Sequence, residues 1–144
     1  MRTFYLFDVK ENVLKNYRNN YEELYGLLES IHYLKTEDII LGFNIYQKLV
    51  NPMKKEEYND YIKKNNLGKE NYICYNYTHT INDFYFNEST KMIINNSHIK
   101  IKTNKNVPSF FYNIRNFKNI FVCDFNNHDY FLLEDTIYSS CISA

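Results

Sequence analysis

The chain has 144 residues, balances 17 Lys and Arg against 17 Asp and Glu, and is 18% aromatic. This composition excludes an intrinsically disordered protein, because disorder goes with few aromatic residues and a high net charge. No apolar run approaches the roughly 18 residues that a membrane-spanning helix needs, and the N-terminal stretch reaches a carboxylate at Asp8, too early for a signal peptide. We therefore expect one folded cytoplasmic domain over residues 1–144, with no membrane partner.

The N-terminal part of the chain predicts one strand followed by two helices. Residues 3–9 are rich in aromatic and β-branched side chains, which is typical of a strand buried on both faces. A short amphipathic helix is expected over 10–18, where apolar residues recur at helical spacing. Asn20 then begins a second helix, and Glu23 completes a capping-box pattern with it. The predicted buried stripe of this second helix is Tyr21, Leu24, Tyr25, Leu28 and Ile31.

Two further helices are expected before the strand-rich part of the chain. Thr36 supplies a hydroxyl cap and is followed by two acids, which complement the N-terminal end of a helix dipole. The helix that begins there ends before Pro52, because the residue before a proline is pushed out of the helical region. Its predicted buried stripe is Ile39, Phe43, Tyr46 and Val50. A fourth helix is expected over 53–65.

From residue 71 the apolar period changes to two, which indicates strands. The first strands of this region are expected at 72–77, 84–86, 92–94 and 98–102. A short helix follows Pro108, and two last strands, 120–125 and 130–133, flank a hairpin turn. Because strands come in blocks, the sequence predicts an α+β fold: a single domain whose mainly antiparallel sheet, the N-terminal strand plus C-terminal hairpins, packs with about four to five helices.

Residues that could hold a metal ion or a phosphate group are scattered along the chain. The three glycines are too far apart for a Gly-rich phosphate loop, so no nucleotide cofactor is expected. The histidines stand singly and no C-x-x-C pair occurs, so we expect no metal site and reduced thiols. The residues in question are His32, His79, His98 and His128, with Cys74, Cys123 and Cys141.

One catalytic alternative remains open, a nucleophilic pair of Cys123 and His128 across the last hairpin. Cys123 lies in an apolar run, however, where a thiol is usually part of the core. The carboxylate pair of Asp124 and Asp129 fits a turn better than acid–base chemistry. We therefore expect a protein that is not an enzyme, with no cofactor and no small-molecule substrate.

Charge is unevenly distributed, which keeps a nucleic-acid hypothesis open. Residues 91–123 contain no acid, whereas 124–144 contain no Lys or Arg. The basic 91–118 region, with Lys100, Lys102, Arg115 and strand aromatics, has the ingredients of a module for single-stranded nucleic acid. The acidic C-terminal stretch can neutralise this charge within the molecule, so direct nucleic-acid binding is the alternative and not the first expectation.

The helices carry more tyrosine than a small core needs, which favours an interface with another protein. Tyrosine is enriched at interfaces because its ring gives contact area at low rotamer cost. We expect two or three of these rings to be exposed anchors and the others to pack in the core. The tyrosines in question are Tyr17, Tyr21, Tyr25, Tyr33, Tyr58 and Tyr61.

Four short segments are spread along most of the chain: Phe-Tyr-Leu-Phe-Asp-Val-Lys-Glu at 4–11, Ile-His-Tyr-Leu at 31–34, Tyr-Gln-Lys-Leu at 46–49 and Phe-Val-Cys-Asp-Phe-Asn at 121–126. Together these segments resemble the sporulation inhibitor of replication (SirA) family. The resemblance implies a small domain whose early helices bind the N-terminal domain of the replication initiator DnaA. Binding there would block a new round of chromosome replication as a cell commits to sporulation.

The resemblance also implies which residues contact the partner. Tyr17 and Tyr33 match family tyrosines, and Val13 stands where family members place an aromatic. These three would form the apolar centre of the contact, with a polar rim of Glu11, Asn12 and Ser30. A regulator with another protein target remains an alternative.

Overall fold

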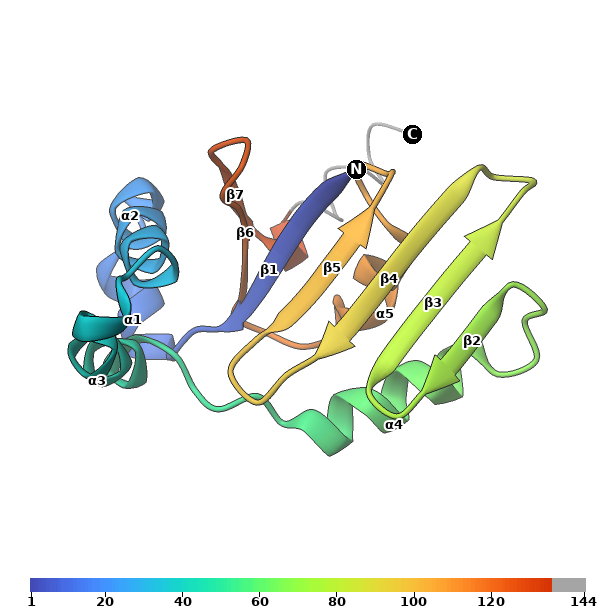
Figure 1. Cartoon of the computed structure of the whole chain (residues 1–144), viewed down its shortest axis with the longest axis horizontal. Helices are drawn as coiled ribbons and strands as arrows, with labels where there is room; N and C mark the ends of the chain where they lie inside the picture. Colours follow the sequence, from blue (N-terminus) through green and yellow to red (C-terminus); the bar gives the residue numbers. More distant parts are fainter. Residues whose placement is uncertain (136–144) are drawn as a thin grey trace.

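The computed structural model describes residues 1–135, and a seven-stranded antiparallel sheet forms its frame (Figure 1). The strands are β1 (Arg2–Asp8), β2 (Tyr72–Tyr75), β3 (Thr78–Asp83), β4 (Glu88–Ile94), β5 (Ile99–Thr103), β6 (Ile120–Asp124) and β7 (Asp129–Leu132). Their order across the sheet is β2-β3-β4-β5-β1-β6-β7, so β1 lies between the two blocks of hairpins. The predicted α+β class and antiparallel sheet are confirmed.

The helices fill the connections between β1 and β2 and between β5 and β6. They are α1 (Glu11–Asn16), α2 (Tyr21–His32), α3 (Ile39–Leu49), α4 (Lys55–Asn66) and α5 (Ser109–Ile114), with a 3₁₀ turn, η1 (Thr36–Asp38), before α3. No helix in the described part of the chain is both long and apolar enough to cross a membrane.

Two cores form because the helices pack on opposite faces of the sheet. Helices α4 and α5 cover one face, where Phe4 and Leu6 of β1 join a first core. Helices α1, α2 and α3 gather at the β1–β6–β7 end of the other face, where Phe7 joins a second core (Figure 1). Alternation along β1 therefore sends its side chains to both cores. The residues buried in the second core include Val13, Leu24, Tyr25, Leu28, Phe121 and Cys123.

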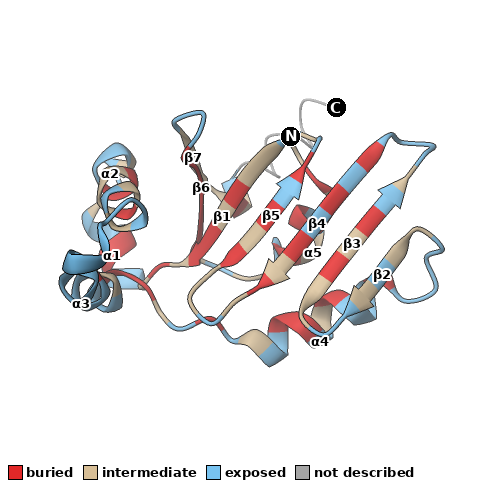
Figure 2. Cartoon of the chain, viewed as in Figure 1, coloured by how far each residue is buried: buried red, intermediate tan, exposed pale blue. Residues whose placement is uncertain are grey.

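The second face of the sheet is covered by helices at one end only. Side chains of β2 to β5 that alternate with the first core project from the uncovered part, here called the open sheet face (Figure 1). Figure 2 shows that exposed residues occur along β5, β4 and β3. The open sheet face consists of Ile73, Tyr75, Thr78, Thr80, Asn82, Ser89, Lys91, Ile93, Lys100 and Lys102.

The capping pattern at the start of α2 forms in part. Asn20 precedes the helix as predicted, but its side chain makes no hydrogen bond to the helix backbone. The Asn20 amide instead donates to the Glu23 carboxylate, with Nδ2 2.9 Å from Oε2. The helix depends more on its buried stripe, because Leu24, Tyr25 and Leu28 are all in the second core.

The strand predicted at 84–86 is wrong. These residues form the turn between β3 and β4, and Phe84 and Tyr85 are 100% and 89% exposed. The Asp83 carboxylate accepts the backbone N–H of Phe86, at 3.1 Å, which is a typical turn contact. The strand lies earlier, in the polar Thr78–Asp83 segment, because alternate residues of that segment, such as Ile81, pack in the first core.

Candidate partner-binding surface

Helix α3 is apolar on nearly every side, yet only a narrow strip of it is buried. Gly42 and Leu49 are its buried residues, while Ile40 is 76% exposed. Successive residues of an α-helix are turned by about 100°, so the exposed apolar side chains lie on both flanks of the strip. With the end of α2 they form a surface here called the α2–α3 apolar surface. It consists of Tyr33, Leu34, Ile39, Ile40, Leu41, Phe43 and Ile45.

The stripe predicted for this helix is therefore wrong in part. Val50 is buried and Tyr46 packs against the second core, but Ile39 and Phe43 are exposed. The reason is the position of α3, which lies at one end of the molecule beside α1 and α2 (Figure 1). Only one side of the helix contacts the rest of the protein there, so α3 has more apolar residues than that contact can bury.

The C-terminal end of α3 is tied to the end of β1 by backbone hydrogen bonds. Lys10 N–H donates to the carbonyl of Leu49 at 3.0 Å, and Asn51 N–H donates to that of Asp8 at 2.8 Å. Toward its other end, α3 approaches α2 where Leu34 packs directly onto Gly42. Any Cβ at position 42 would displace the Leu34 side chain, so glycine permits this close approach.

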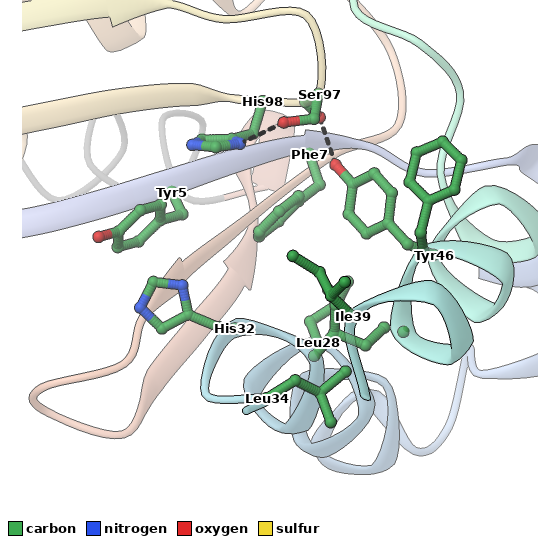
Figure 3. A pocket seen from close by; sticks show the side chains of 12 residues that line it. Tyr5, Phe7, Leu28, His32, Leu34, Ile39, Tyr46, Ser97 and His98 are labelled. Carbon is green, nitrogen blue, oxygen red and sulfur yellow. Dashed lines mark hydrogen bonds between the residues drawn. The ribbon is translucent and has the colours of Figure 1, made fainter. Parts of the chain in front are cut away.

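A cavity of about 330 Å³ lies between α2, α3 and the sheet (Figure 3). Engineered apolar cavities of roughly 150 Å³ already hold a benzene ring. The cavity has room for a large apolar group, and most of its lining is apolar. Lining side chains from α2, α3 and the segment between them include Leu28, Ile31, Leu34, Ile39 and Phe43.

Two hydrogen bonds join polar groups that line the cavity. The Tyr46 hydroxyl donates to the carbonyl of Ser97, and Ser97 Oγ lies 2.7 Å from His98 Nδ1 (Figure 3). Burial, with smaller contributions from His32 and Lys100, lowers the pKa of His98 to about 4. Burial lowers the pKa of His32 as well. Both rings are neutral at pH 7, so the cavity suits an uncharged group.

The residues implied by the SirA resemblance are divided between core and surface. Val13 is buried in the second core and Tyr17 is half-buried against it. Tyr33 is 59% exposed and belongs to the α2–α3 apolar surface, where its ring packs against His32 and Phe125. Val13 therefore supports the helices from inside, whereas Tyr33 is available to a partner.

The three rim residues of the resemblance are all exposed. Glu11 and Asn12 lie on α1, where the Glu11 carboxylate is 3.9 Å from the ammonium of Lys15. Ser30 lies on α2 and donates its hydroxyl to the carbonyl of Gly26 at 2.8 Å. The sequence predicted the helix that α3 forms but not its place in a binding surface. The available signal was the Ile-Ile-Leu run followed by Phe43, because these apolar residues surround the helix and do not form one stripe.

The Cys123–His128 pair does not meet at an accessible site. Cys123 is fully buried in the second core, and burial raises the pKa of its thiol. His128 is exposed, with Nε2 3.4 Å from a carboxylate oxygen of Glu22. Within residues 1–135, no three His, Cys, Asp or Glu side chains are grouped as a metal site would require.

Comparison with models of known protein families gives no match for this chain, and no curated protein matches it.

Proposed function

We propose that the protein is a non-enzymatic cytoplasmic inhibitor of DNA replication initiation that binds the N-terminal domain of DnaA through the α2–α3 apolar surface. One observation carries the proposal of a protein partner: α3 exposes Ile39, Ile40 and Phe43, which lie within about 100° of one another around the helix. Contiguous exposed apolar surface on a folded domain marks interaction sites. The identity of the partner as DnaA rests on the SirA resemblance.

The cavity beside α3 gives this contact an anchor point. Interfaces derive most of their binding free energy from a few side chains that fill well-packed pockets. An apolar side chain of the partner would enter between Leu34 and Phe43 and contact the neutral histidine rings behind them. Tyr33 would lie at the edge of this contact, with Tyr17, Ser30 and the exposed residues of α1 further out. Binding would be stoichiometric and would prevent productive assembly of the initiator at the replication origin.

The experiment measures binding of the purified N-terminal domain of the host's DnaA by calorimetry. Phe43→Lys should weaken binding at least tenfold, because a charge at the mouth of the cavity must be desolvated. Ile73→Lys is the matched control, since Ile73 is an exposed apolar residue on the open sheet face, and it should bind like the wild type.

Different failures identify which part of the proposal is wrong. Absence of affinity for the host's initiator would exclude DnaA as the partner. If Phe43→Lys binds with wild-type affinity and Tyr17→Lys binds more weakly, DnaA is the partner but the contact lies at α1 and not at α3.

A further inference from the structure

The open sheet face carries three lysines that repel one another. Lys91 of β4 lies directly opposite Lys102 of β5 in the antiparallel register, and Lys100 precedes Lys102 by two residues on β5. Like charges directly opposite each other in a sheet are destabilising. A protein that keeps such a pair on an uncovered face gains stability from any anion that binds there.

No carboxylate in the described part of the chain neutralises these lysines. None of the three takes part in an ion pair among residues 1–135. The acidic residues at the end of the β3–β4 hairpin, Asp83 and Glu88, alternate onto the opposite face. There the Asp83 carboxylate accepts from the amide of Asn71, and Glu88 accepts from the backbone and hydroxyl of Ser109.

The positive charge continues toward the β1 end of the face. Lys100 Nζ lies 5.7 Å from the centre of the Tyr5 ring, and its charge acts on both His98 and His32. After burial, the charge of Lys100 lowers the pKa of both histidines. No carboxylate among the described residues influences the pKa of either histidine, so the charge of Lys100 is not neutralised on this side.

Exposed aromatic rings flank the lysines. Tyr75 projects from β2 on the open sheet face and is exposed. The turn between β3 and β4, here called the aromatic turn, carries Phe84, Tyr85 and Phe86, of which the last two pack edge to face at 4.9 Å. Lys91 lies three residues along β4 from Glu88, which directly follows the aromatic turn, a span of roughly 10 Å at strand spacing. Cations and free aromatic faces thus lie within the reach of a few nucleotides.

We propose that the open sheet face binds single-stranded nucleic acid, with phosphates at Lys91, Lys100 and Lys102 and bases stacked on Tyr75 and the aromatic turn. Proteins that bind single strands combine a basic surface with exposed rings in this way. A duplex keeps its bases paired and stacked, so it can use the lysines but not the rings. The basic residue Arg115 does not take part, because it follows α5 on the opposite face, and Lys91 takes its place.

The first measurement is the fluorescence anisotropy of a labelled thymidine oligonucleotide of about 15 nucleotides, a length within the range that such surfaces cover. Binding should fall with salt, with a slope of about −0.7 in log K against log salt for each neutralised phosphate. The Lys91→Gln/Lys102→Gln variant should bind at least tenfold more weakly and lose about 1.4 of that slope. Lys63→Gln/Lys64→Gln is the matched control, since both side chains are exposed on α4 and the charge change is equal.

The second measurement tests the rings. Phe84→Ala and Tyr85→Ala should each weaken binding about fivefold, because stacking on one ring is lost. Both side chains are almost fully exposed, so their removal leaves the fold intact. Phe43→Ala, an exposed ring on α3, is the control and should bind oligonucleotide like the wild type. Because Phe43 belongs to the proposed DnaA contact, this control also shows whether the two binding surfaces are separate.

Three results would overturn the proposal. One is the absence of binding at about 50 mM salt, where phosphate contacts are strong. Another is equal loss in the two double-lysine variants, which would indicate attraction to net charge alone. The third is equal affinity for a duplex of the same length or equally effective competition by polyglutamate, either of which would show that the surface recognises only negative charge. Binding of the RNA equivalent with the same dependence on lysines and rings would support it.

Discussion

Nε2 of His79, on β3, lies 2.7 Å from the amide oxygen of Asn59, on α4. The hydroxyl of Tyr72 lies 2.6 Å from Nδ1 of the same ring. An amide oxygen only accepts, so Nε2 carries the ring proton and Nδ1 accepts from Tyr72. His79 is fully buried and neutral in this arrangement, which joins the outer strands of the sheet to the helix beneath them.

This contact predicts a loss of stability in mild acid. Burial and, next, the charge of Lys63 lower the pKa of His79 from 6.5 to about 4. Between these two values the unfolded chain binds a proton that the folded protein does not, so the free energy of unfolding falls as pH is lowered through this window. The contribution is roughly 3 kcal/mol below pH 4 relative to pH 7. Urea unfolding from pH 7.5 to 4 measures it, and His79→Gln should show a shallower slope. An unchanged slope in that variant would assign the effect to other groups, such as His98.

Arg2 should stabilise the last hairpin mainly through its buried partner. Its Nε lies 3.0 Å from Asp124, which is fully buried, and its Nη2 lies 2.7 Å from the half-exposed Asp129. Arg2→Met leaves the Asp124 carboxylate without its cation and should cost about 2 kcal/mol, less than for a fully buried pair because Arg2 is 24% exposed. Asp129→Asn should cost under about 1 kcal/mol. Urea unfolding at pH 7 compares the two, and equal costs would contradict the difference in burial.

Substitution of an isoleucine should cost much more folding free energy in α4 than in α3. Ile62 of α4 is fully buried in the first core, so Ile62→Ala should cost about 3 kcal/mol of folding free energy. Ile40 of α3 is largely exposed, so Ile40→Lys should change it by less than about 0.5 kcal/mol. Thermal and urea unfolding give both values. A large loss in Ile40→Lys would mean that α3 is covered in the isolated protein.

The two described cysteines should differ in reactivity. Cys74 is partly exposed, whereas Cys123 is fully buried and its thiol pKa is raised by burial. Because the thiolate is the reactive form, iodoacetamide should modify Cys74 in the native protein and Cys123 only after unfolding in urea. Peptide mass spectrometry reads each site separately, Cys141 included. Native modification of Cys123 at the rate of Cys74 would show that this thiol is accessible and would revive the Cys123–His128 hypothesis.

Elements whose apolar residues recur with one clear period were predictable, because the residues on that apolar side are the ones that are buried. The strand at the N-terminus, the α2 stripe and the hairpin of β6 and β7 are confirmed close to their expected bounds. The sequence predicted a strand at 84–86, whereas the polar Thr78–Asp83 segment forms the strand and the aromatic segment 84–86 forms the turn after it. The apolar content of these segments did not predict the strand, because only one face of β3 is covered by a helix and only alternate residues need to be apolar.

The sequence by itself determined the class of fold, the order of the elements and the absence of a Gly-rich phosphate loop, because periodicity and spacing are properties of the chain. It also showed that positive charge gathers at 91–123. Only the tertiary structure decided which sides of those elements are covered. Helix α3 keeps Ile40 exposed because it lies at one end of the molecule, and Lys91 faces Lys102 because the register of β4 and β5 aligns them. A periodic pattern says which residues share a side, whereas exposure depends on whether another element packs there.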